Sequence, residues 1–96
     1  MADDAVYRHA PDLVLRRIGE EAVVVPVRNN VGDLDSVFTL NQSAITIWES
    51  LDGQTALHRA IDRVCTEYEI DRDTAAADAR ELIGRLAEAG LIERVD

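Results

Sequence analysis

The hydrophobic pattern of this chain changes its period once, at Asn41, and this change limits the folds that the chain can adopt. Before Asn41, runs that are rich in Val, Ile and Leu or that alternate in polarity are typical of strands, over 13–18, 21–27 and 36–40. Gly19 and Glu20 separate the first two runs, as in a tight hairpin. Pro26 lacks an amide proton, so the second strand must end there, bulge there or turn that position to solvent. The first part of the chain therefore predicts three short strands.

After Asn41 the apolar residues recur every three to four positions, as they do on one face of a helix. Either Asn41 or Ser43 can cap the first helix, which is expected to end at the Asp-Gly pair of residues 52–53. A second helix is expected to start from a Thr55 cap and to run to Tyr68.

The third helix is expected to begin at Asp71 or Asp73 and to end at Gly90, followed by a short extended tail over 91–95. This order of elements predicts an α+β fold, a three-stranded antiparallel sheet followed by three helices, and it suits a small winged helix-turn-helix-like domain. A chain of 96 residues is long enough for one core. We expect a flexible N-terminus over 1–10 and a single domain over 11–96.

The charge balance excludes several functions. Asp and Glu number 19 against ten basic residues, all of them Arg, so the formal net charge is -9. Such a charge repels phosphate backbones and anionic membrane surfaces, so neither nucleic acid nor membrane is an expected partner. Without a lysine, the chain cannot supply a lysine nucleophile, a Schiff base or a P-loop lysine.

Single residues with reactive or aromatic side chains are all given structural roles. His9 and His58 are interpreted as ordinary surface side chains, and Cys65 and Trp48 fall on the inward stripes of their helices, where core packing explains them. One cysteine cannot form an internal disulfide, which favours a reducing, cytoplasmic location. No nucleophile, base and oxyanion donor assemble into a catalytic pattern, and no metal or cofactor motif is present, so the sequence predicts a binding module and not an enzyme.

Two groups of residues resemble the signature of the PqqD-like family. The run FTLNQSA over 38–44, with Ile47-Trp48 and Leu51-Asp52-Gly53, is similar to the family's FxLN-x-x-A…IW…L-DG pattern, and Asp78, Leu82, Leu86 and Gly90-Leu91-Ile92 are similar to its D-x-x-x-L-x-x-x-L…GLI ending. The similarity extends from about Tyr7 onward. Residues 25–35 depart from the members that serve pyrroloquinoline quinone synthesis, because the segment is longer and lacks their Pro-Glu element. This departure argues against that quinone as the product.

The resemblance implies a winged-helix-like recognition element for ribosomally synthesised peptides that are later modified. In such domains the leader of the precursor peptide is bound as an added strand beside the third strand, over a groove formed with the third helix. The core segment is delivered to a modifying enzyme, often a radical SAM protein. Carried over to this chain, the resemblance implies a peptide-binding site of eight residues: Val37, Phe38, Thr39, Leu40, Asp78, Glu81, Leu82 and Arg85.

Elementary physics agrees with strand addition, since an edge strand without proline or lysine is a template for pairing, and residues 36–40 contain neither. Two alternatives use the same fold. A DNA-binding winged helix would place the third helix in the major groove, but residues 71–90 carry five acidic side chains against three basic ones, and these would repel phosphates. A homodimerising adaptor would pair the same edge with a second copy.

Overall fold

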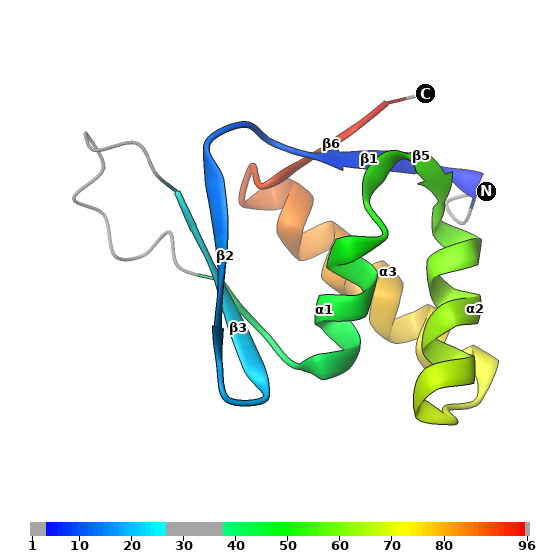
Figure 1. Cartoon of the computed structure of the whole chain (residues 1–96). Helices are drawn as coiled ribbons and strands as arrows, with labels where there is room; N and C mark the ends of the chain where they lie inside the picture. Colours follow the sequence, from blue (N-terminus) through cyan, green and yellow to red (C-terminus); the bar gives the residue numbers. More distant parts are fainter. Residues whose placement is uncertain (1–3, 27–37, 96) are drawn as a thin grey trace.

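The computed structural model describes residues 4–26 and 38–95, which form two three-stranded antiparallel sheets and three helices (Figure 1). The elements in chain order are β1 (Val6–His9), β2 (Leu13–Ile18), β3 (Glu21–Pro26), β4 (Phe38–Leu40), α1 (Gln42–Glu49), β5 (Asp52–Ala56), α2 (Leu57–Tyr68), α3 (Arg72–Glu88) and β6 (Ile92–Arg94). This is the predicted α+β, winged-helix-like fold, to which a second sheet is added.

The predicted hairpin is confirmed as β2 and β3, in register from Leu13 opposite Pro26 to Ile18 opposite Glu21. Gly19 takes a φ of 65°, which the tight turn requires and which side chains disfavour. Pro26 is the last residue of β3. β4 adds to the other side of β3, with Thr39 opposite Val23. The predicted third strand begins at 36, and its first two residues lie outside the described part of the chain.

The second sheet has the order β5-β1-β6 and was not expected from the sequence. The sequence predicts a flexible segment over 1–10, whereas Val6–His9 form the central strand of this sheet, paired on both sides. The preceding Ala5 is fully buried. Both partner strands come from segments more than forty residues away in the chain, so the local pattern around residue 6 carried no sign of them.

The segment between α1 and α2 is a strand, not a helix end followed by a cap. α1 ends at Glu49, before the predicted stop at 52–53. The Asp52 carboxylate accepts hydrogen bonds from the Gln54 and Thr55 amides and from the Thr55 hydroxyl, which also hold the pKa of Asp52 below its usual value. Because Thr55 is engaged there, it does not cap α2.

One amide in the first turn of α2 is satisfied instead by the N-terminal segment. The N-cap residue Ala56 makes no side-chain cap, and the Leu57 amide donates to the Ala5 carbonyl at 2.9 Å. A helix leaves its first amides without partners within the helix, so the chain ahead of β1 supplies an acceptor for one of them.

The other two helix starts follow the sequence prediction. Asn41 caps α1 by accepting from the Ala44 amide, and Asp71 caps α3 by accepting from the Thr74 amide. The Thr74 hydroxyl and amide hydrogen bonds lower the pKa of Asp71. Gly90, with φ 78°, ends α3 in a Schellman motif, in which the Leu91 amide donates to the Leu86 carbonyl.

The core lies between the three helices and the inner face of the β2–β3–β4 sheet. Its largest fully buried side chains are Val24, Leu40, Leu51, Leu57, Ile61 and Leu86. Trp48 is 4% exposed, as predicted, and Cys65 is half-buried against the core. His9 is not an ordinary surface residue, because its ring stacks on Trp48 with centroids 3.8 Å apart.

Candidate functional site

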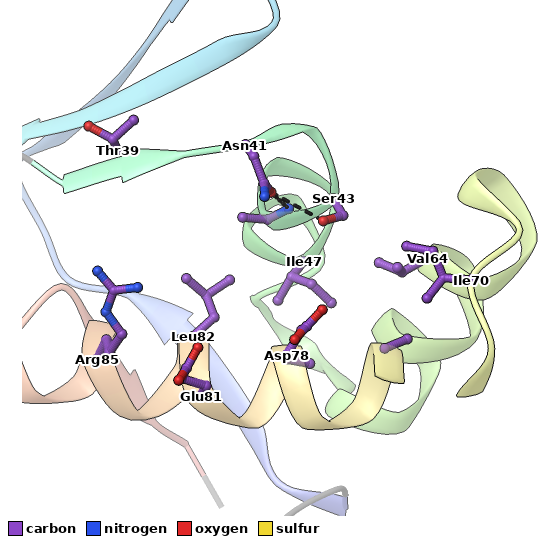
Figure 2. A pocket seen from close by; sticks show the side chains of 13 residues that line it. Thr39, Asn41, Ser43, Ile47, Val64, Ile70, Asp78, Glu81, Leu82 and Arg85 are labelled. Carbon is purple, nitrogen blue, oxygen red and sulfur yellow. Dashed lines mark hydrogen bonds between the residues drawn. The ribbon is translucent and has the colours of Figure 1, made fainter. Parts of the chain in front are cut away.

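A groove of about 260 Å³ lies between β4 and α3. Figure 2 shows β4 running between β3 and α3, so the groove opens along the side of β4 that β3 does not cover. Its lining comes from β4, all three helices and the segments beside them: Thr39, Asn41, Ser43, Ala44, Ile47, Val64, Ile70, Ala75, Asp78, Ala79, Glu81, Leu82 and Arg85.

The floor of the groove is apolar. Ile47 of α1 and Val64 of α2 are buried beneath it, and Leu82 of α3 is half-buried at its side (Figure 2). Ala75 and Ala79 form the inner face of the first turns of α3, and their short side chains leave space that a larger residue would fill. The floor can therefore receive apolar side chains from a ligand.

The rim of the groove along α3 is charged. Asp78, Glu81 and Arg85 are exposed. The Arg85 guanidinium lies over the Phe38 ring, 5.0 Å from its centroid, a cation–π contact that joins α3 to β4. Within residues 4–26 and 38–95, neither Asp78 nor Glu81 forms an ion pair, so both carboxylates face solvent at the mouth of the groove.

The backbone of β4 is the remaining wall. In an antiparallel ladder, successive residues point their N–H and C=O groups alternately toward and away from the partner strand. The groups of β4 that point away from β3 have no strand beside them among the described residues. An extended chain laid in the groove could pair with them while its side chains reach the apolar floor.

The comparison with family models decides which protein family has this fold and groove. Residues 21–92, three quarters of the chain, match the model described as "Coenzyme PQQ synthesis protein D (PqqD)". The chain belongs to the PqqD family. This confirms the resemblance seen in the sequence, and the matched span contains β3, β4 and all three helices of this PqqD-family protein.

A solved structure supports the same assignment. The structure described as "TbiB1 in Complex with the TbiA(beta) Leader Peptide" matches with a TM-score of 0.70 and 26% sequence identity, and the match covers 90% of this chain and 94% of that chain. A search of curated proteins found no match.

The structure brings most of the sequence-predicted site residues together. Thr39, Asp78, Glu81, Leu82 and Arg85 all line the groove, and Phe38 adjoins it under Arg85. The Leu40 side chain is fully buried in the core, so Leu40 can offer a ligand only its backbone. Val37 lies outside the described residues.

Sequence reasoning missed the rest of the lining. The unpredicted lining residues are Asn41, Ser43, Ala44, Ile47, Val64, Ile70, Ala75 and Ala79. Ala75 and Ala79 carry a readable signal, since small residues spaced four apart on a helix mark a face that leaves space. Val64 and Ile70 carry none, because only the packing of α2 against α3 brings them to the groove.

No three side chains among His, Cys, Asp and Glu in residues 4–26 and 38–95 lie close enough together to hold a metal ion. No helix in that part of the chain combines the length and apolarity that crossing a membrane requires.

Proposed function

We propose that this protein is a peptide-binding module that takes the leader of a ribosomally synthesised precursor peptide as an added strand on β4. One observation carries the proposal: within the described residues, the edge of β4 that faces away from β3 has no partner strand, and it stands beside an apolar groove in a PqqD-family chain. The related structure was solved with a leader peptide, which supports this class of ligand.

The β4 backbone and the apolar floor of the groove contribute differently to peptide binding. The β4 backbone supplies hydrogen bonds that fix the register of the peptide and tolerate many sequences. The floor around Ile47 and Leu82 supplies selectivity, at roughly 1 to 3 kcal/mol for each apolar side chain that it buries. Phe38, Thr39 and Leu40 present the pairing edge, while Asp78, Glu81, Leu82 and Arg85 contact the peptide side chains.

The module is non-catalytic in this proposal and acts in the cytoplasm. It presents the core segment of the precursor to a modifying enzyme, with a radical SAM protein as the expected class. That step rests on what the family resemblance implies, and it requires no cofactor held by this chain.

Chemical-shift mapping tests the site. Isotope-labelled protein is titrated with peptides selected from a displayed random library by binding to the protein. We expect the shifts to concentrate in residues 38–41 and 78–85. Shifts confined to β2 or α2 would contradict the site, and a rise in mass by light scattering without peptide would favour the homodimer.

Leu82→Glu tests the floor. A carboxylate in place of this half-buried leucine should weaken peptide binding by about tenfold or more, because the peptide's apolar side chain would meet a charge. Ile18→Glu is the matched control, since Ile18 is 66% exposed on the hairpin, away from the groove. Equal binding by both variants, each with its melting temperature preserved, would rule out the groove.

A further inference from the structure

The charges around the groove are separated along its length. α3 runs antiparallel to β4, so Asp78 lies near Asn41 and Ser43 while Arg85 lies near Thr39 (Figure 2). The part of the groove toward α1 therefore carries carboxylates, Asp78 at its end and Glu81 beside Leu82, and the opposite end carries a guanidinium (Figure 2). We name these the acidic end, Asp78 and Glu81, and the basic end, Arg85.

A second hollow extends the acidic end. Asn41, Ser43 and Ile70 line both the groove and a neighbouring hollow, and that hollow adds Glu20 and Glu21 from the hairpin turn. All four carboxylates belong to exposed residues, and none pairs with an arginine within the described residues. The two arginines beyond this hollow are already paired, Arg17 with Glu49 and Arg63 with Glu67.

The basic end is held in place. Arg85 stacks on Phe38, the first residue of β4, and forms no ion pair within the described part of the chain. Its side chain is therefore positioned beside the strand edge, with its charge available to a ligand.

We infer that this separation selects the leader by charge. The groove takes a strand that carries a lysine or arginine at the acidic end, an apolar side chain beside Leu82, and an acidic side chain at Arg85. The inference rests on the proposed peptide binding and names the class of peptide. A strand of uniformly acidic side chains would be repelled at the acidic end.

The spacing follows from element geometry. Asp78 and Arg85 are seven residues apart on α3, about 10 Å at roughly 1.5 Å per residue. An extended peptide covers that length in about three residues at roughly 3.3 Å each, and only every second side chain faces the groove. Since side chains on the groove side lie two residues apart, one apolar side chain between the two charges sets their spacing at four residues. That spacing is about 13 Å at roughly 3.3 Å each, which is the closest such spacing to the roughly 10 Å along α3.

The test uses a displayed library of random peptides, selected separately against the wild-type chain, Glu81→Arg and Glu88→Arg. Glu88 is the matched control, because it is an exposed glutamate on the same helix that does not line the groove. Melting curves check that all three proteins fold.

We expect the wild type and Glu88→Arg to enrich peptides with a basic side chain about four positions from an acidic one. Glu81→Arg should lose that preference. For a synthetic peptide chosen on the wild type, reversing the charge of its basic residue should weaken binding to the wild type by about fivefold. Glu81→Arg should instead bind the charge-reversed peptide more tightly than the original peptide. Both effects should shrink at high ionic strength.

Enriched peptides with the same charge preference on the wild type and on Glu81→Arg would overturn this inference and leave the proposed function standing. A selection on the wild type that enriches no peptide at all would overturn both.

Discussion

Trp48 connects α1 to the N-terminal strand through its ring and its backbone. The His9 ring lies almost parallel to the indole, 10° between planes, and His9 Nε2 is 2.7 Å from the Trp48 carbonyl oxygen. A carbonyl oxygen only accepts, so Nε2 carries the proton in this contact. The indole thus belongs both to the core under the helices and to the contact with the second sheet.

Trp48→Ala should destabilise the domain by about 3 to 5 kcal/mol, because it leaves a large cavity and removes the surface on which His9 packs. Urea unfolding followed by circular dichroism measures this loss, and His58→Ala, which alters the other histidine, is the control. A Trp48→Ala protein that melts within a degree or two of the wild type would show that the indole is not central to the core.

At the scale of elements, β4 is the critical strand, because it is only three residues long and has two different sides. β3 pairs with one side, and the groove lies along the other. The Thr39 side chain is exposed, whereas Phe38 and Leu40 pack against the core or in it, so changes at Thr39 spare the core.

Thr39→Pro tests which side of β4 binds peptide, because proline removes one backbone donor. If the Thr39 amide faces the groove, peptide binding should weaken by about tenfold or more while the melting temperature is kept. If it faces β3, the domain itself should lose stability, and the test moves to the backbone of Phe38 or Leu40. Calorimetric titration and thermal melting of Thr39→Pro and Thr39→Ala distinguish the two cases, and a proline with neither effect would argue against strand addition here.

At the scale of the whole molecule, the N-terminal segment holds distant parts together. β1 lies between β5 and β6, and Ala5 accepts the Leu57 amide at the start of α2 (Figure 1). Removing residues 1–10 should therefore lower the melting temperature strongly, since β5 and β6 lose their common partner. Thermal melting of the shortened chain against the full chain measures this, and unchanged melting would show that β1 adds little to the fold.

The net charge of -9 is also a property of the whole chain. We expect no binding of random duplex DNA at physiological salt, because α3 of this winged-helix-like fold would bring carboxylates to the phosphates. A gel-shift titration is the measurement, and binding below micromolar concentration would contradict the expectation.

Local patterns in the sequence were sufficient to predict most of the helices, strands and turns. The hairpin around Gly19 and the stop at Gly90 were predicted from neighbouring residues, and the caps of α1 and α3 were each narrowed to two candidates, of which Asn41 and Asp71 are the caps, because turns and caps are made within a few positions of the chain. The family signature likewise indicated the strand and helix that border the groove.

Tertiary structure alone decided the rest. β1 exists because β5 and β6, both distant in the chain, supply its hydrogen bonds, and α2 begins at Leu57 because Ala5 supplies an acceptor there. The same is true of the groove floor, where Val64 is brought into the lining by helix packing. A residue's own neighbours set its local conformation, but pairing and burial depend on partners whose position no short stretch of sequence contains.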